Sequence, residues 1–198
     1  MIRLAAAAVL TFALIACSKP RLELQPHDRL PAAGEHHADE TPAVTNESAP
    51  PSVVQDATGA SVDLATVWAQ QRVLVVFYMG HWCPHCQKQL ADLDARRGEL
   101  AATGTAIVAV STDAPADAAA LHDRLRLGFA VYSDPELAVI TRWGAQDYAQ
   151  NIAKPSVFVV EPGGAISYRH IGESQTDRPT VDQLLAILKA HAAPATPE

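Results

Sequence analysis

The chain has 198 residues, of which 48% are hydrophobic and 19% charged, and its formal net charge is −7. This length and apolar content suffice for one globular domain with a buried core. Proteins that bind nucleic acids normally carry a basic patch or stripe, so the acidic balance argues against a nucleic-acid partner.

The N-terminal residues 1–16 have the pattern of an export signal. Arg3 precedes an apolar stretch that ends at Ala16, too short for a membrane span of about 20 residues. The letters LIAC, ending at Cys17, resemble the lipobox of bacterial lipoproteins. By that resemblance Cys17 is lipidated and anchors the protein to a membrane of the cell envelope, and Ser18 after it favours the outer membrane, facing the periplasm. The alternative is an ordinary secretory signal with an incidental cysteine.

Residues 17–51 are rich in Pro, Ala, Glu and His and show no sustained apolar period. This composition predicts a flexible tether after the lipidated cysteine. Its histidines admit a second interpretation, a metal-binding tract, although a solvated linker is favoured; they are His27, His36 and His37. The folded domain is predicted over 52–192 and a disordered tail over 193–198.

From residue 52 on, turn signals separate short apolar runs. Residues 72–79 form a continuous run rich in β-branched side chains, typical of a strand buried on both faces. In chain order we predict two short strands around Thr58 and Gly59, a strand over 72–79, a helix over 83–102, a strand over 105–111, a helix over 113–127 capped by Asp113, a strand over 128–134, a helix over 135–144, a hairpin of 156–160 with 165–171, and a helix over 178–192. Strands alternating with helices, then a hairpin and a last helix, predict an α/β domain with a central mixed sheet flanked by helices.

The sequence Cys83-Pro84-His85-Cys86 stands where the strand over 72–79 gives way to a helix. A helix N-terminus favours an anion, so we expect Cys83 to ionise readily and to act as the nucleophile. Pro84 suits the first helical position, and His85 adds positive charge when it is protonated. Cys86 lies one turn further on, within disulfide range, and is expected to resolve a mixed disulfide.

The cysteine pair admits two other interpretations. A structural zinc site needs four ligands, and the chain has no second cysteine pair, so no metal is expected. A purely structural disulfide over so short a loop would restrict the unfolded chain very little. His81 and His85 are candidates for proton transfer to Cys86, and simple solvent exposure explains them equally well. No cofactor is expected.

Three stretches carry a family resemblance: VLVVFYMGHWCPHCQKQL, AVYSDPELAVITRWG and AKPSVFVVEPGGAISYRHIG. They resemble the redoxin group of the thioredoxin-like superfamily, which includes thioredoxins and the AhpC/TSA-type peroxiredoxins. The resemblance covers about residues 52–192 and implies a thioredoxin-like fold. It also implies that Pro155 is a cis-proline facing the cysteine motif, and that Trp82 covers the rim of the site.

The chain departs from the family at three positions. Peroxiredoxins carry Thr or Ser three residues before the reactive cysteine, where this chain has Gly80, and they carry Arg in the neighbourhood of Lys154. Both differences weigh against efficient peroxide reduction. Thioredoxins carry a buried Asp where this chain has Phe77.

The sequence therefore predicts a thiol–disulfide oxidoreductase that exchanges the Cys83–Cys86 pair with protein cysteines in the cell envelope. A membrane electron donor or acceptor would restore the pair after each cycle. The first alternative is a peroxiredoxin-like thiol peroxidase with an antioxidant role. The second alternative is a redox-inert lipoprotein that acts as a binding module.

Overall fold

The computed structural model describes residues 47–191. The predicted signal peptide, the lipidation site Cys17, nearly all of the tether and the C-terminal tail lie outside these residues. Within 47–191, no helix is both long and apolar enough to cross a membrane.

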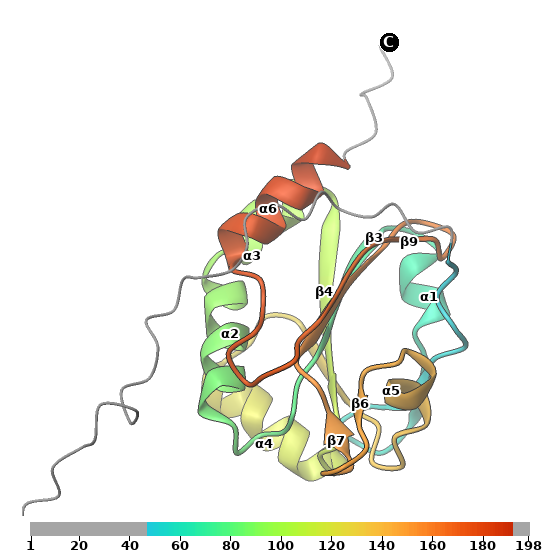
Figure 1. Ribbon diagram of the computed structural model, residues 1–198, viewed down its shortest axis with the longest axis vertical. Coiled ribbons are helices and arrows are strands. Elements are labelled where there is room, and N and C mark those ends of the chain that lie inside the picture. Colours follow the sequence, from blue (N-terminus) through green and yellow to red (C-terminus); the bar gives the residue numbers. More distant parts are fainter. Residues whose placement is uncertain (1–46, 192–198) are drawn as a thin grey trace, which may run out of the picture. The chain divides into compact units, whose positions relative to one another are not determined.

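A seven-stranded mixed sheet forms the centre of the domain, in the order β2-β1-β5-β4-β3-β8-β9 (Figure 1). Its strands are β1 (Val53–Gln55), β2 (Ser61–Asp63), β3 (Arg72–Phe77), β4 (Thr105–Ser111), β5 (Ala130–Ser133), β8 (Ser156–Val160) and β9 (Ile166–Ile171). Strands β3, β4 and β5 run parallel, whereas β8 pairs antiparallel with β3 and β9. The predicted α/β domain with a central mixed sheet is confirmed.

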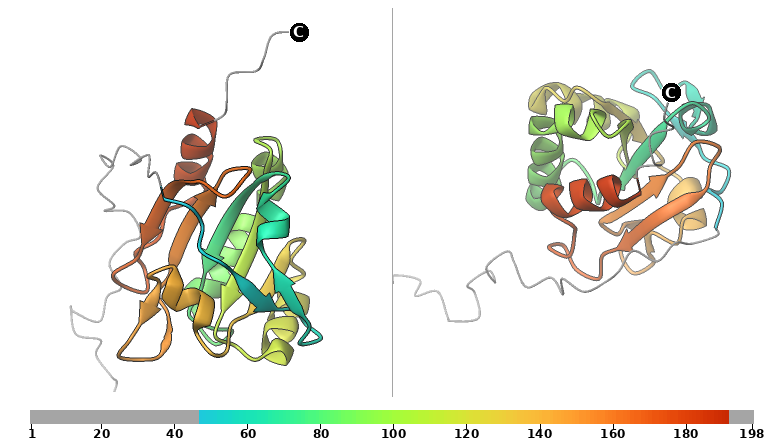
Figure 2. Two further views of the ribbon diagram at one scale, coloured as in Figure 1. Left: turned by 90° about the vertical axis from the view of Figure 1, so that its right-hand side faces the viewer. Right: turned by 90° about the horizontal axis from the view of Figure 1, so that it is seen from above.

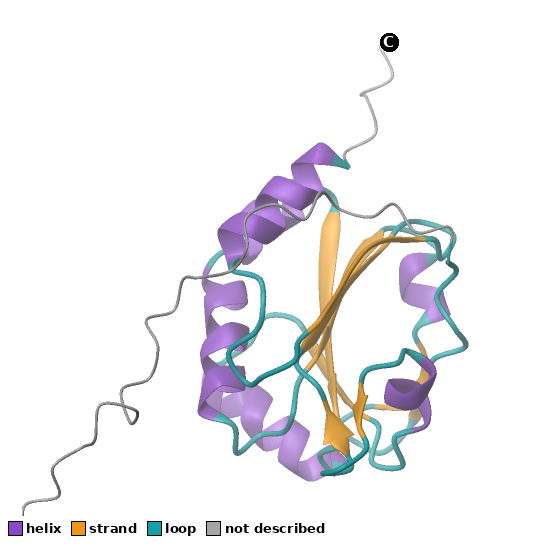
Figure 3. Cartoon of the chain, viewed as in Figure 1, coloured by secondary structure: helices purple, strands orange, loops and turns teal. Residues whose placement is uncertain are grey.

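Helices cover both faces of this sheet (Figures 1 and 3). They are α1 (Ala65–Trp68), α2 (Pro84–Ala95), α3 (Arg97–Ala101), α4 (Pro115–Leu125), α5 (Ala138–Arg142) and α6 (Val181–Ala190). Helices α2, α3, α4 and α6 lie on one face and α1 and α5 on the other, as the two further views also show (Figure 2). The sheet is therefore the middle of three layers.

Strand β3 is buried along its whole length, as predicted. Successive side chains of a strand point to opposite faces, so Leu74 and Val76 pack in the cluster under α2, α4 and α6. Val73, Val75 and Phe77 pack in the second cluster, which contains the aromatic side chains Trp68, Trp143 and Phe158. Each such side chain contributes about 1.5–3 kcal/mol by leaving water. The strand thereby holds the cysteine motif that follows it against a rigid core.

The helix predicted over 83–102 is two helices, broken at Arg96, whose φ of −112° and ψ of 18° are not helical. The break lets the apolar stripe continue, because Leu100 after it is fully buried. Arg97 turns to solvent and pairs with Asp94 at 2.6 Å. The sequence predicted a single helix, whereas the structure has two helices that meet at Arg96.

Three segments were not anticipated, and the first is the short helix α1. A separate two-stranded sheet is formed by β6 (Gln146–Asp147) and β7 (Ile152–Ala153), too short to leave a period in the sequence. Residues that precede the predicted domain also contact it: Ser48 bridges Ala165, and Glu47 pairs with Arg169 at 3.0 Å.

Candidate active site

Cys83 is the N-cap residue of α2, in extended conformation, and Pro84 occupies the first helical position. The backbone N–H of Cys86 donates to Cys83 Sγ at 3.3 Å. The sulfur thus accepts from one of the amides that a helix start leaves unpaired. This is the location that the sequence predicted for the reactive sulfur.

The two cysteine side chains meet at the base of this helix. Cys83 and Cys86 are both free thiols, and their Sγ atoms lie 2.6 Å apart. Both residues are 0% exposed and belong to the core cluster beneath α2. Met79 completes the packing, with its Sδ 3.9 Å from Cys83 Sγ. The pair can close into a disulfide without movement of the backbone, but a large substrate does not reach Cys83 in this arrangement.

The Cys86 thiol is hard to ionise. Burial raises the pKa of Cys86 to about 11, and the hydrogen bond with Cys83 acts in the same direction. The positive charge of Arg178 opposes this rise. Since only a thiolate attacks, Cys86 reacts mainly when another group helps it to lose its proton.

Arg178 is a site residue that the sequence analysis did not find. It lies in the loop before α6, and its Nη2 is 3.8 Å from Cys86 Sγ. Its Nη1 donates to Gln89 Oε1 at 2.8 Å and to the carbonyl of His85 at 3.3 Å. Arg178 and Cys86 are 92 positions apart in the sequence, and nothing in the linear pattern linked the two.

A second polar group lies on the other side of the motif. His81 Nδ1 is 2.8 Å from Asp113 Oδ1, and Ser111 donates its hydroxyl to Asp113 Oδ2 at 2.8 Å. Asp113 was predicted to cap α4, but the N-cap is Ala114, and no side chain caps that helix. The buried carboxylate holds His81 instead. Strands β3 and β4 are parallel neighbours, so their carboxyl ends had to lie together, which is the signal that could have revealed this contact.

His81 and His85, the two candidates for proton transfer to Cys86, have different surroundings. His81 is fixed by Asp113 and its side chain is 39% exposed, so it is not merely a solvated residue. His85 is half-buried, and its carbonyl rather than its ring contacts Arg178. Tyr78 is buried, and Asp113 and Cys86 both act on its phenol. It keeps its proton because burial raises the pKa of the phenol far above the ordinary value.

Trp82 stands beside Gly80, at the entrance to the motif. Its side chain is largely open to solvent, with the residue 51% exposed. A Cβ placed on Gly80 would lie 2.6 Å from Trp82 Nε1 and 3.1 Å from Asp113 Oδ1. The indole therefore fills the space in which a larger residue at position 80 would stand. A threonine there requires Trp82 to move.

Pro155 is not a cis-proline: within 47–191 all peptide bonds are trans. It directly precedes β8, where its missing N–H costs no ladder hydrogen bond, and its carbonyl accepts from the N–H of Gly172 at 2.8 Å. The residue nevertheless lies near the motif. Pro155, Lys154 and Met79 line a common cavity of about 120 Å³. The predicted isomer is wrong, and the predicted orientation of Pro155 toward the cysteine motif stays a prediction.

Phe77 lies on the opposite face of the sheet from the cysteines. Its ring packs edge-on against Trp143, with centroids 5.5 Å apart, and against Phe158 at 5.8 Å. A carboxylate at position 77 would enter that aromatic cluster and not the site. A carboxylate near the motif comes instead from Asp113, which follows β4.

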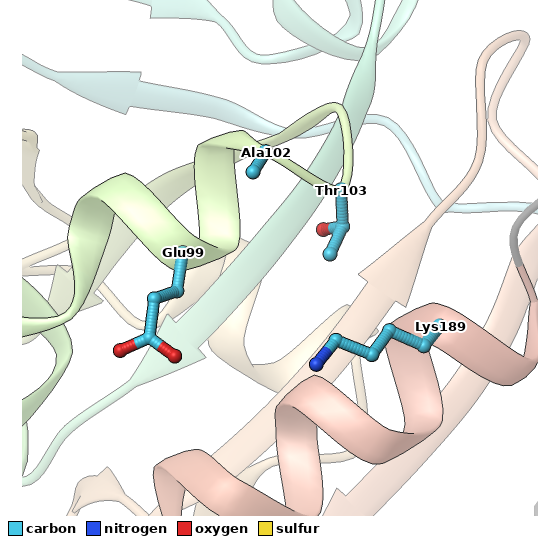
Figure 4. A pocket seen from close by; sticks show the side chains of 4 residues that line it. All are labelled: Glu99, Ala102, Thr103 and Lys189. Atoms are coloured by element: carbon cyan, nitrogen blue, oxygen red, sulfur yellow. The ribbon is translucent and has the colours of Figure 1, made fainter.

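A larger hollow, of about 370 Å³, lies between α3 and α6 (Figure 4). Glu99, Ala102 and Thr103 line it on one side and Lys189 on the other. None of these residues belongs to the cysteine motif. Within 47–191 no group of His, Cys, Asp and Glu side chains is arranged to hold a metal ion.

Comparison with known proteins identifies the family of this chain. Residues 45–169 match the AhpC/TSA family. A putative peroxiredoxin of Mycobacterium tuberculosis is 35% identical over 126 residues, which cover 61% of this chain and 80% of the relative. The thiol-disulfide oxidoreductase ResA of Halalkalibacterium halodurans is 25% identical over 156 residues, covering 78% and 83% of the two chains.

Among solved structures, the peroxidoxin BcpB of Mycobacterium tuberculosis superposes with a TM-score of 0.68 at 22% identity, covering 75% of this chain and 98% of that one. The fold is thus thioredoxin-like, as predicted. The relatives support the peroxidase alternative better than the thiol–disulfide exchange that the sequence analysis placed first. The redox chemistry of thiols is common to both, and the chain belongs to the AhpC/TSA family.

Proposed function

We propose that the chain is a thiol peroxidase that cycles through a Cys83–Cys86 disulfide. The Cys83 thiolate attacks a hydroperoxide, the O–O bond breaks, and the alcohol or water leaves while Cys83 becomes a sulfenic acid. The Cys86 thiolate then attacks that sulfur, the S–O bond breaks, and water leaves as the disulfide forms. Two electrons from an external dithiol return the pair to thiols.

The observation that carries this proposal is the burial of Cys83 beside its resolving partner. The sulfur is 0% exposed and 2.6 Å from Cys86 Sγ. A protein disulfide has to align its own sulfur with the attacking one and therefore needs an open surface, whereas a hydroperoxide brings only two oxygen atoms to the thiolate. The similarity to peroxiredoxins supports the same function.

Two features make the expected peroxidase a slow one. Gly80 offers no hydroxyl to the peroxide, and the indole of Trp82 occupies that space. Lys154 carries a charge but lacks the planar fork of donors that arginine presents. The donors that remain on Cys83 Sγ are the amide and the thiol of Cys86. We expect peroxide to react with Cys83 faster than with a free thiolate, helped by this amide and the helix dipole.

The test follows the reduced full chain in stopped flow with hydrogen peroxide and with cumene hydroperoxide, using tryptophan fluorescence. We expect Cys83→Ser to abolish the signal, and Cys86→Ser to leave a Cys83 sulfenic acid that dimedone traps. Mass spectrometry of the Cys83 peptide identifies the adduct. A rate with both peroxides no faster than that of a free thiolate at equal thiolate concentration would exclude the peroxidase.

A second function, thiol–disulfide exchange with protein cysteines, is favoured by the spacing of the motif and by the similarity to ResA. It requires the segment around Trp82 to open. It predicts that the wild type reduces insulin, and that Cys86→Ser accumulates mixed disulfides through Cys83. Loss of both activities, with a reduction potential below about −300 mV, would instead indicate a redox-inert binding module.

We further propose that the protein is anchored in the cell envelope through a lipid on Cys17. The support is the resemblance of its N-terminal sequence to a lipobox. Metabolic labelling with palmitate should mark the wild type and not Cys17→Ser, and equal labelling of both would contradict the anchor.

A further inference from the structure

We propose that Arg178 is a further functional residue of the site: its guanidinium favours the thiolate form of Cys86 and so sets the rate at which Cys86 closes the disulfide. This inference deepens the proposed function and rests on it for the rate of closure. The effect of Arg178 on the ionisation of Cys86 can be measured without any peroxide.

The guanidinium is held in place from two directions. Nε and Nη2 of Arg178 donate to the carbonyl of Gln175 at 3.0 and 2.6 Å, within the loop before α6. Nη1 donates to Gln89 Oε1 and to the carbonyl of His85, both on α2. These bonds fix the plane of the group and leave Nη2 at 3.8 Å from Cys86 Sγ.

Of the groups that the Arg178 guanidinium contacts within 47–191, the Cys86 thiol is the one that can ionise. The carbonyls and the amide oxygen that it contacts stay neutral at every pH, whereas the Cys86 sulfur becomes an anion when its proton leaves. An opposite charge within about 4–6 Å favours the charged form of a group by roughly one to three pKa units. Arg178 is therefore the charged group that offsets the cost of ionising this buried thiol, and the backbone hydrogen bond between Cys86 and Met79 acts in the same direction.

The other titratable groups that act on Cys86 do not supply this help. Cys83, whose sulfur is 2.6 Å away, raises the pKa of Cys86 through its hydrogen bond. Tyr78 remains a neutral phenol because burial raises its pKa. Burial of Cys86 itself acts against ionisation. Without the positive charge, we expect the thiolate fraction of Cys86 to fall about tenfold or more at neutral pH.

The first experiment measures the alkylation of Cys86 by iodoacetamide between pH 7 and 11, in the full chain carrying Cys83→Ser. Peptide-resolved mass spectrometry separates Cys86 from Cys17. Arg178→Gln and Arg178→Lys form a matched pair, since both lose the planar fork and only the lysine keeps the charge. Arg124→Gln is the control, because Arg124 approaches the carbonyl of His81 at 3.4 Å and not the sulfur.

We expect Arg178→Gln to lower the alkylation rate about tenfold at each pH between 7 and 10, below the midpoint of the profile. Arg178→Lys should retain most of the wild-type rate, and Arg124→Gln should leave it unchanged. An unchanged profile in Arg178→Gln, or equal losses with glutamine and lysine, would overturn the role of the charge.

A second readout concerns the complete dithiol. After a pulse of hydrogen peroxide, Arg178→Gln should show several-fold more dimedone-trapped Cys83 than Arg178→Lys, because closure by Cys86 is slower. Equal trapping despite a shifted alkylation profile would overturn the effect on closure. Should peroxide fail to oxidise Cys83 at all, the proposed peroxidase is lost, while the alkylation profile still decides whether Arg178 governs the ionisation of Cys86.

Discussion

Replacing Gly80 by alanine tests how tightly the entrance to the cysteine motif is packed. The added Cβ would lie 2.6 Å from Trp82 Nε1 and 3.1 Å from Asp113 Oδ1, whereas ordinary contact begins at 3.4 Å. Gly80 also has a φ of +158°, a backbone conformation that residues with side chains rarely adopt. Both effects destabilise the folded state.

The loss of stability in Gly80→Ala depends on whether Trp82 or Asp113 can move away from the added Cβ. Overpacking in a core costs typically about 1–3 kcal/mol. Trp82 is 51% exposed and can swing outward, so the lower part of that range applies. We expect Gly80→Ala to lower the free energy of unfolding by about 1–2 kcal/mol, which corresponds to a fall in Tm of roughly 2–8 °C for a chain of this size.

Thermal unfolding followed by circular dichroism measures the effect, with Gly98→Ala as the matched control. Gly98 lies in α3 and has no atom within 4 Å of its added Cβ, so alanine there should stabilise the protein by about 0.5–1 kcal/mol. In a Trp82→Ala background the cost of Gly80→Ala should shrink. A neutral Gly80→Ala, or a cost that is the same with and without the indole, would refute the packing argument.

Two further predictions concern the C-terminal helix and the pH dependence of the site. Arg72 is buried, pairs with Glu161 at 2.8 Å and donates to the carbonyls of Leu188 and His191. Arg72→Met should therefore lower the free energy of unfolding, measured with denaturant, by about 3 kcal/mol and speed amide exchange in α6. An unchanged denaturation midpoint would contradict this prediction. Because burial raises the pKa of Cys86 to about 11, disulfide closure after a peroxide pulse should accelerate about tenfold per pH unit between about pH 7 and 9; a flat profile in stopped flow would count against attack by the Cys86 thiolate.

The sequence alone indicated most of the strands and helices and the place of the cysteine pair. The apolar run of β3 and the turn signals around the hairpin of β8 and β9 depend on local periodicity, which the chain displays directly. The place of Cys83 at a helix start followed from Pro84 and the strand before it. Features that depend on residues adjacent in the sequence can be predicted from the sequence.

Only the tertiary structure decided what surrounds the two sulfurs. Arg178 reaches Cys86 because the loop before α6 packs against α2, and Asp113 leaves its expected capping role because the end of β4 lies beside that of β3. The isomer of Pro155 and the complete burial of Cys83 likewise depend on how distant segments pack. Contacts between segments far apart in sequence leave no period or spacing to read, so the groups that govern ionisation and access at this site appear only when the chain is folded.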